Sequence, residues 1–233
     1  MPKLRYLCVR FSNNIFPYDI PFFRSAVIEK TARVASLFHN HKDDIAVIYR
    51  YPLIQYKVTF KKASIICLDQ GADDIHHLLQ HRTMELRIGK TTQTFEVEDI
   101  DLHYHQVQTW DTMFEYSLLN WMALNQKYHA RFKELEGDEN AQIDLLESIL
   151  KGNILSFAKG INWYVEERIK VKIQSIKSIK LLPFKGRKVL TFCVNFKTNV
   201  SLPDYVGLGK GSSVGFGVVK QIYVNNKRKE TNE

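Results

Sequence analysis

Two histidines one residue apart, His39 and His41, are the side chains of this sequence best suited to proton transfer. Histidine has an ordinary pKa of about 6.5, so it can act as an acid or a base near neutrality. If the segment around the pair is extended, both side chains point the same way, because alternate residues of a strand share a face. Lys30 precedes the pair and Tyr49 and Tyr51 follow it, so a charge and a phenol are near in sequence.

Metal binding is the alternative interpretation of this pair. A second pair with the same spacing, His103 and His105, occurs later in the chain. Zinc takes three or four protein ligands, so one pair is insufficient and the two pairs would have to meet. His103 and His105 also alternate along a predicted strand, where they would form its polar face. Acid–base chemistry and metal binding both stay open at this point.

A glycine-rich loop lies near the end of the chain. Residues 207–217 read Gly-Leu-Gly-Lys-Gly-Ser-Ser-Val-Gly-Phe-Gly and hold five of the 11 glycines. Such loops allow close backbone approach and present amides that bind anions. A strand and not a helix is expected to follow, so the loop fits neither a Walker A motif nor a dinucleotide fingerprint. A phosphate contact is expected, with a tight hairpin as the alternative. The residues assigned to the contact are Gly207, Gly209, Lys210, Gly211, Ser212, Ser213, Gly215 and Gly217.

Basic residues concentrate before this loop. Some alternate along the predicted strand Trp163–Ile176, and others crowd the turn that follows it. Cations on one side of a strand repel one another unless an anion covers them. The alternative is an edge strand that lysines protect against aggregation. The predicted anion contacts are Arg168, Lys170, Lys172, Lys185, Arg187 and Lys188.

The formal net charge of +8 divides unevenly along the chain. Lys and Arg counted against Asp and Glu give +7 for residues 1–62, −10 for residues 63–167 and +11 for residues 168–233. If the two basic segments fold onto one face, that face attracts polyanions. The acidic middle is then expected on faces turned away. A solvated, lysine-rich surface is the alternative.

Composition excludes several classes of protein. The 233 residues are 45% hydrophobic and 12% aromatic, which excludes a disordered chain and allows one large or two small domains. No apolar run is long enough for a transmembrane helix, and charges within the apolar start argue against a secretory signal. Cys8, Cys67 and Cys193 lie far apart, which favours a reducing compartment over a disulfide framework. We therefore expect a cytoplasmic protein.

Hydrophobic periodicity over residues 1–105 predicts a β-α-β-β-α-β order, the split βαβ pattern of a ferredoxin-like domain. The predicted strands are Leu4–Phe11, Ala46–Tyr51, Leu53–Leu68 with a break near Lys61 and Lys62, Met84–Ile88 and Thr94–Tyr104, and the predicted helices are residues 21–38 and Asp73–Gln80.

Residues 106–233 predict a second small α+β domain. Its predicted helices are Phe114–Phe132 and Ala141–Lys159, and its predicted strands are Trp163–Ile176, Lys188–Phe196 and Val218–Val224.

Several stretches, taken in order, resemble a known family. The glycine-rich loop, preceded by residues 196–204, resembles the signature of the CRISPR repeat-associated RAMP proteins, and more narrowly of their crRNA-processing endoribonuclease branch. The further stretches that agree with this branch are residues 21–30, 37–41, 49–57 and 119–125. One departure is Val214, because many relatives carry a basic residue just before Gly-Phe-Gly. That phosphate contact is absent here or comes from another residue.

The resemblance implies an α+β fold of tandem ferredoxin-like domains, here residues 1–105 and 106–233, with RNA on a basic surface between them. It implies metal-independent cleavage of CRISPR repeat RNA without a cofactor, leaving a 5′-hydroxyl and a 2′,3′-cyclic phosphate or 3′-phosphate. The basic residues and the glycine-rich loop would then contact RNA, and the cationic row suits the phosphate backbone of a duplex stem.

The resemblance also carries catalytic roles onto particular residues. His39 and His41 would transfer protons, Lys30 would stabilise charge in the transition state, and Tyr49 or Tyr51 would orient or assist. Which histidine is the acid and which the base stays open.

Two other functions remain as alternatives. One is a non-catalytic RNA-binding RAMP subunit, and the other is a metal-dependent hydrolase built on His39, His41, His103 and His105. The expected partners are CRISPR repeat RNA, subunits of a CRISPR effector complex and a second copy of the chain, with no membrane.

Overall fold

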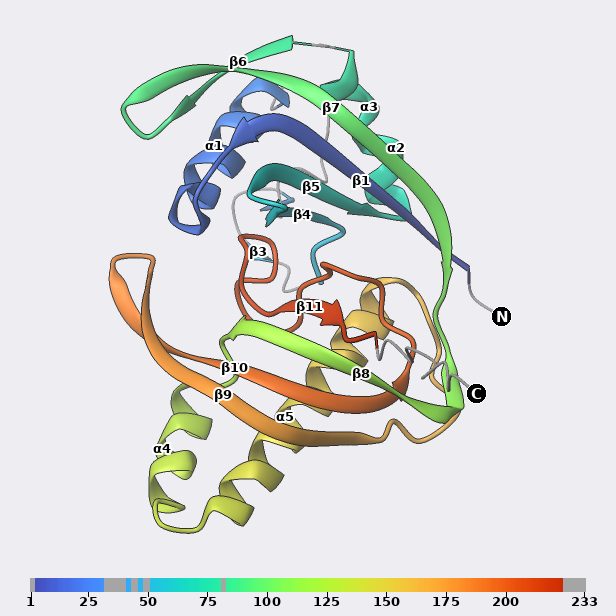
Figure 1. Ribbon diagram of the computed structural model, residues 1–233, viewed down its shortest axis with the longest axis vertical. Coiled ribbons are helices and arrows are strands. Elements are labelled where there is room, and N and C mark those ends of the chain that lie inside the picture. Colours follow the sequence, from blue (N-terminus) through green and yellow to red (C-terminus); the bar gives the residue numbers. More distant parts are fainter. Residues whose placement is uncertain (1–2, 32–40, 43–45, 48–50, 81–82, 224–233) are drawn as a thin grey trace, which may run out of the picture.

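The computed structural model describes residues 3–31, 41–42, 46–47, 51–80 and 83–223. Two larger antiparallel sheets, each carrying its own helices, stack in two domains (Figure 1). Helix α1 (Ile20–Thr31) lies on the face of the first sheet turned away from the second domain, and the glycine-rich loop lies between the sheets. This arrangement confirms the α+β class with tandem ferredoxin-like domains.

The first sheet has the strand order β4-β5-β1-β7-β6. Strand β6 is an addition that forms a hairpin with β7, and the other four strands, β1, β4, β5 and β7, are the first to the fourth strand of a β-α-β-β-α-β unit. The first strand, β1, lies between the third, β5, and the fourth, β7, as in a ferredoxin-like domain. The strands are β1 (Lys3–Asn14), β4 (Ile54–Thr59), β5 (Lys62–Leu68), β6 (Thr83–Ile88) and β7 (Thr91–Gln106). The helices are η1 (Pro17–Asp19), α1 (Ile20–Thr31), α2 (Gln70–Asp74) and α3 (His76–Leu79), and β2 (His41–Lys42) and β3 (Ala46–Val47) form a separate hairpin.

Alternation along β1 gives the first sheet two different faces. Leu7, Val9 and Phe11 are buried in the core that the sheet shares with α1. Tyr6 and Arg10 point the other way, toward the second domain. The face that meets the second domain is thus polar in part.

The turn between β4 and β5 confirms the predicted break near Lys61 and Lys62. Phe60 and Lys61 have φ values of 51° and 65°. Two successive residues with positive φ form the tight turn that matches the twist of an antiparallel hairpin.

The second sheet has the order β11-β8-β10-β9. Its strands are β8 (Thr109–Trp121), β9 (Val171–Phe184), β10 (Arg187–Val200) and β11 (Val218–Gln221), and its helices are α4 (Gln126–Glu134) and α5 (Glu139–Gly160). This is again a ferredoxin-like order, but residues 201–217 form an irregular segment where the second helix of such a domain would be. Helix α5 confirms the prediction over Ala141–Lys159, and the Asp138 side chain caps it by accepting from the Ala141 N–H at 3.0 Å.

The predicted helix Phe114–Phe132 is wrong. Residues up to Trp121 belong to strand β8, and the helix in this region, α4, begins at Gln126. Tyr116 and Leu118 are buried on one face of β8, and Leu118 pairs with β10 on one side and β11 on the other. Leucines and aromatic residues suit a buried strand as well as a helix, and pairing with partners far along the chain decides between them.

The predicted strand Trp163–Ile176 is also shifted. Strand β9 begins at Val171, so Arg168 and Lys170 precede it in an irregular segment. The Asn199 side chain accepts from the Lys170 N–H at 2.8 Å and donates to the Arg168 carbonyl at 3.3 Å. These bonds from β10 occupy backbone groups that a strand would use.

Helix α1 covers the first part of the predicted helix over residues 21–38, and residues 32–38 lie outside the described residues. Asp73–Gln80 contains the end of α2 and the whole of α3. Of the predicted strand Ala46–Tyr51, β3 occupies Ala46 and Val47.

One hydrophobic core joins the two domains. Leu4 and Ile66 of the first sheet belong to the same buried cluster as Trp121, Phe157 and Leu208 of the second domain. The domains are therefore packed together directly. None of the helices in the described part of the chain is long and apolar enough to span a membrane.

Candidate functional site

The glycine-rich loop contacts both domains through its backbone. Val214 forms a parallel bridge with Tyr56 of β4, and Lys210 forms an antiparallel bridge with Met122, which follows β8. Leu208 is buried in the core shared by the domains. The loop is therefore an ordered part of the domain interface, and it is more than the tight hairpin considered as an alternative.

Glycine is required at two points of this loop. At Gly207, a Cβ atom would lie 2.6 Å from Ser212 Cβ and 2.7 Å from Lys57 Nζ. At Gly215, where φ is +86°, a Cβ atom would overlap the Ile20 side chain at the start of α1. Both positions need the close backbone approach that glycine permits.

Two polar side chains from the first domain hold Gly207. The Gly207 N–H donates to Gln55 Oε1 at 2.8 Å, and the Tyr51 hydroxyl donates to the Gly207 carbonyl at 2.9 Å. Gln55 Nε2 in turn donates to the Tyr51 hydroxyl at 2.8 Å. Tyr51, Gln55 and Gly207 are all buried, so this network docks the loop against the first domain.

Tyr51 therefore serves the loop, although it was one of the two tyrosines assigned to catalysis by resemblance. Burial raises the pKa of Tyr51 above its ordinary value, and its hydroxyl is engaged both as donor and as acceptor. A protonated, enclosed phenol is poorly placed to exchange protons with a substrate. Tyr49, the other candidate, lies outside the described residues.

Removal of the Tyr51 hydroxyl is expected to destabilise the protein by about 1–3 kcal/mol, because the buried Gly207 carbonyl loses its donor and one N–H of the Gln55 amide loses its acceptor. Urea unfolding of Tyr51→Phe measures this free energy. The matched control is Tyr104→Phe on β7, where the ring is 66% exposed and a change below about 0.5 kcal/mol is expected. Equal stability of the two variants would contradict a role for the Tyr51 hydroxyl in holding the loop.

A buried lysine lies under the same loop. Lys57 of β4 is 0% exposed, and its Nζ donates to the Ser212 carbonyl at 2.6 Å. Burial lowers the pKa of Lys57 to about 7, from an ordinary value of 10.5. The signal for Lys57 in the sequence is a lysine within the buried strand Ile54–Thr59, and no functional role was predicted for it.

The predicted contact residues of the loop differ in their exposure. Lys210 is exposed, Ser213 is half-buried, and Ser212 is buried beside Lys57. Of these three side chains, which are predicted to donate hydrogen bonds to a phosphate, Lys210 and Ser213 are therefore the accessible ones.

The tip of the β9–β10 hairpin lies beside the glycine-rich loop. The Phe184 ring contacts the Phe216 ring edge to face, with 5.4 Å between the centroids. Lys185, Arg187 and Lys188 form the tip, and all three are exposed. The structure thus brings these three predicted contacts together with the loop.

The start of β9, which contains Lys172, lies at the end of the ribbon opposite the tip (Figure 1), and Arg168 and Lys170 come just before this strand. Lys172 and Lys185 are separated by most of β9, roughly 40 Å at the rise of a strand. Lys172 also forms an ion pair with Glu147 of α5 at 3.3 Å. The six basic residues predicted from sequence therefore form two separate groups.

The catalytic candidates are placed only in part. Lys30 is exposed near the end of α1, about 15 Å along the helix from Ile20, which contacts the glycine-rich loop at Gly215. His41 lies in β2, which pairs with β3, and His39 lies outside the described residues.

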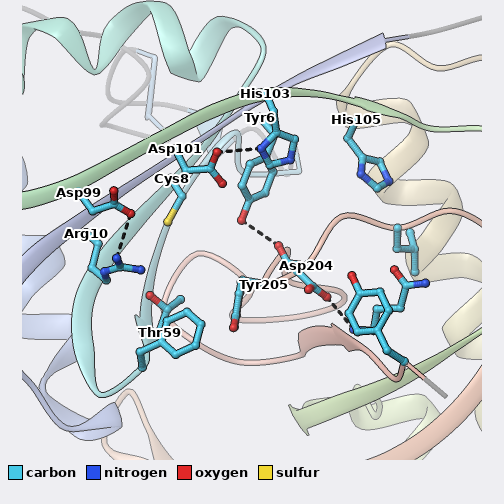
Figure 2. A pocket seen from close by; sticks show the side chains of 14 residues that line it. Tyr6, Cys8, Arg10, Thr59, Asp99, Asp101, His103, His105, Asp204 and Tyr205 are labelled. Carbon is cyan, nitrogen blue, oxygen red and sulfur yellow. Dashed lines mark hydrogen bonds and ion pairs between the residues drawn. The ribbon is translucent and has the colours of Figure 1, made fainter. Parts of the chain in front are cut away.

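A cavity of about 280 Å³ opens between the domains (Figure 2). Side chains from β1 and β7 form its upper wall, and residues 202–205, with Gln221 and Tyr223, form the lower wall. The lining residues are Tyr6, Cys8, Arg10, Thr59, Phe60, Asp99, Asp101, His103, His105, Leu202, Asp204, Tyr205, Gln221 and Tyr223.

Carboxylates give this cavity an acidic character. Asp99, Asp101 and Asp204 line it together with a single guanidinium, Arg10, which pairs with Asp99 at 2.9 Å. Part of the acidic middle of the chain thus faces the second domain. Hydrogen-bond donors suit such a cavity better than phosphate groups do.

The two histidines of the second pair are held by protein groups. His103 Nδ1 lies 3.2 Å from Asp101 Oδ1, and its ring stacks on Tyr6 with 4.9 Å between the centroids. His105 Nε2 lies 3.2 Å from the Ser201 carbonyl, and burial lowers the pKa of this histidine. No group of three or more His, Cys, Asp or Glu side chains suited to a metal ion occurs within the described residues.

Solved structures similar to this chain match over both domains. A crystal structure of Cas6b has a TM-score of 0.84 at 29% identity, and a crystal structure of a CRISPR RNA processing endoribonuclease, Cas6b, has a TM-score of 0.73 at 25% identity. Each match covers 95% of this chain and 100% of the other. A type IV Cas6 crRNA endonuclease, at 13% identity and a TM-score of 0.55, shares the fold.

Sequence comparison agrees with these structures. An uncharacterised protein of Methanocaldococcus jannaschii is 37% identical over 113 residues, which cover 48% of this chain and 75% of that protein. Family models for the Cas6b N-terminal domain and the Cas6b C-terminal domain match residues 2–108 and 108–222. Together the two models account for nearly the whole sequence, and the chain belongs to the Cas6b family.

Proposed function

We propose that this protein is an endoribonuclease that cleaves CRISPR repeat RNA to release crRNA. The observation that carries the proposal is the similarity, over 95% of the chain, to a Cas6b described as a CRISPR RNA processing endoribonuclease. The basic hairpin tip beside the ordered glycine-rich loop supports it, because this pairing offers cations and backbone amides to a phosphate backbone.

The reaction we propose is an internal transesterification. The 2′-oxygen attacks the adjacent phosphorus while the bond from phosphorus to the 5′-oxygen breaks, leaving a 2′,3′-cyclic phosphate and a 5′-hydroxyl. One histidine of the pair His39 and His41 takes the 2′-proton, and the other gives a proton to the 5′-oxygen. Lys30 stabilises the added negative charge, and Tyr49 orients the reacting groups. Hydrolysis of the cyclic product would give a 3′-phosphate.

The two basic groups divide the task of holding RNA. Lys185, Arg187 and Lys188 act with Lys210 and the loop amides near one phosphate segment, because the structure brings the tip and the loop together. Arg168, Lys170 and Lys172 contact a more distant part of the RNA. An RNA that engages both groups must extend along the ribbon.

Cleavage of cognate repeat RNA in EDTA tests this function. We expect cleavage to continue in the chelator, because histidines supply both proton transfers, and to stop when the nucleotide before the scissile bond lacks its 2′-hydroxyl. Gel analysis of the products measures cleavage in both experiments. A binding assay checks that the protein still binds the 2′-deoxy RNA.

Each other outcome excludes part of the proposal. Undiminished cleavage of the 2′-deoxy RNA would refute attack by the 2′-oxygen. Loss of activity in EDTA with recovery on adding zinc would favour the metal-dependent hydrolase. Tight binding without cleavage would favour the non-catalytic RNA-binding subunit.

A further inference from the structure

In its protonated form, Lys57 buries a positive charge for which the described residues offer no carboxylate partner. Among the described residues, no carboxylate pairs with Lys57 Nζ, and the acceptor found is the Ser212 carbonyl at 2.6 Å. Burying an ammonium group without a counterion is unfavourable. A neutral donor would suffice to anchor a carbonyl of the loop, as the contact of the Tyr51 hydroxyl with the Gly207 carbonyl shows. The charge beneath the loop therefore points to an anion above it.

The peptide between Ser212 and Ser213 connects Lys57 with the opposite side of the loop. Described peptide bonds are all trans, so the Ser213 N–H points away from the Ser212 carbonyl and hence away from Lys57. The Ser213 carbonyl accepts from the Tyr56 N–H at 2.9 Å, which holds the next peptide against β4 as well. Within the part of the chain that the structure describes, no acceptor for the Ser213 N–H is found. Ser213 itself is half-buried.

We propose that Lys57 is a positioning residue that prepares the Ser213 amide to bind a phosphate group of the RNA. Its ammonium orients the Ser212–Ser213 peptide and polarises it, so that the N–H becomes a stronger donor. This inference rests on the proposed function, because it takes the anion to be an RNA phosphate. It also provides a source for the positive charge that Val214 does not supply in this loop.

The surroundings of Lys57 contain few other charges. The loop segment 207–214 carries one charged side chain, Lys210, which is exposed. Across the sheet, Lys57 pairs with Ser64 of β5, and Ser64 pairs with Arg10 of β1, which Asp99 and Glu98 neutralise. The buried Tyr51 stays protonated. Lys57 is thus the titratable group closest to the Ser212 carbonyl among the described residues.

Lys57→Met tests the proposal, because it keeps the length of the side chain and removes the charge. The probe is a short 2′-O-methyl RNA oligonucleotide, which cannot be cleaved by 2′-oxygen attack. Titration is followed at the Ser213 amide resonance by NMR. With roughly 8 Å between the ammonium and a bound phosphate, we expect the dissociation constant to rise between about 10-fold and 30-fold.

Gln55→Met is the matched control, because it removes a neutral anchor of the same loop. We expect it to weaken binding by less than about threefold. Equal losses in the two variants would reduce Lys57 to a structural anchor and overturn the proposal. A Ser213 amide that does not respond to the oligonucleotide in the wild type would overturn it too. If Lys57→Met does not fold, Lys57→Gln provides the same comparison.

The pH profile separates a charge effect from a packing effect. Burial lowers the pKa of Lys57 to about 7, so the ammonium form dominates only below that pH. The wild type should therefore bind the oligonucleotide more tightly than Lys57→Met by the largest factor below pH 7, and this factor should shrink above pH 7. An advantage independent of pH would contradict the proposal. Cleavage is assayed separately: binding at Ser213 without cleavage refutes the proposed function, and cleavage without a Ser213 response refutes this inference alone.

Discussion

Replacement of His39 and His41 by alanine together is expected to slow cleavage of repeat RNA by about 10³-fold or more, since each positioned acid or base contributes about 10²–10⁴ in rate. The affinity for RNA should change by less than about twofold, because neutral histidines add little to phosphate binding. Single-turnover cleavage and filter binding measure the two quantities. Because acid and base act in one step, the effects of the two single substitutions should not simply multiply.

The pair His103 and His105 is a matched control with the same spacing. These residues lie in the acidic cavity between the domains, where the Asp101 carboxylate and the Ser201 carbonyl hold them. We expect the double alanine variant at 103 and 105 to retain cleavage. Loss of activity in both double variants, together with bound zinc in the wild type, would support the metal-dependent alternative. Unchanged cleavage without His39 and His41 would refute the catalytic assignment.

Neutralising the hairpin tip is expected to produce the largest loss of RNA affinity. The change is Lys185→Ala, Arg187→Ala and Lys188→Ala, which removes three exposed cations beside the glycine-rich loop. Each phosphate contact on single-stranded RNA contributes about 0.7 to the slope of log affinity against log salt, so the slope should fall by about 2. The loss of affinity should be about 10²-fold at low salt and smaller at high salt.

The three basic residues at and before the start of β9 allow a comparison in which the same number of positive charges is removed. Arg168, Lys170 and Lys172 are separated from the tip by most of β9, roughly 40 Å along the strand, and Lys172 is already paired with Glu147. We expect their triple substitution to weaken a full-length repeat less than the tip variant does, and to leave a short oligonucleotide bound at the loop unaffected. Equal losses for both triple variants on the short oligonucleotide would contradict the division of the basic residues into two sites.

Local signals in the sequence predicted much of the first domain. Alternation over Leu4–Phe11 predicts a strand, which is β1. The predicted break near Lys61 and Lys62 corresponds to the turn between β4 and β5. Both features depend on neighbours within a few residues, so local pattern is sufficient to recognise them. The anion-binding role of the glycine-rich loop, which its charge and glycine content indicate, stays a prediction.

Features that depend on distant partners were mispredicted or missed. Residues 114–121 form a strand because β10 and β11 pair with it, and a local leucine and aromatic pattern cannot show such pairing. Tyr51 is one of the two tyrosines that the resemblance suggests for catalysis, and the structure shows that its hydroxyl holds a loop 156 residues away. Lys57 was missed, because its importance lies in burial under Ser212, 155 positions later.

Local sequence patterns are sufficient to predict the α+β class, the residue types able to transfer protons and the glycine-rich loop. Which of these features lie together depends on the tertiary structure. It places Phe184 of the hairpin tip against Phe216 of the loop and separates the other basic group by the length of β9. It also sets a buried ammonium against the loop backbone. Propensity and periodicity act over a few residues, whereas such contacts arise when packing closes long loops, and the sequence pattern carries no direct record of that closure.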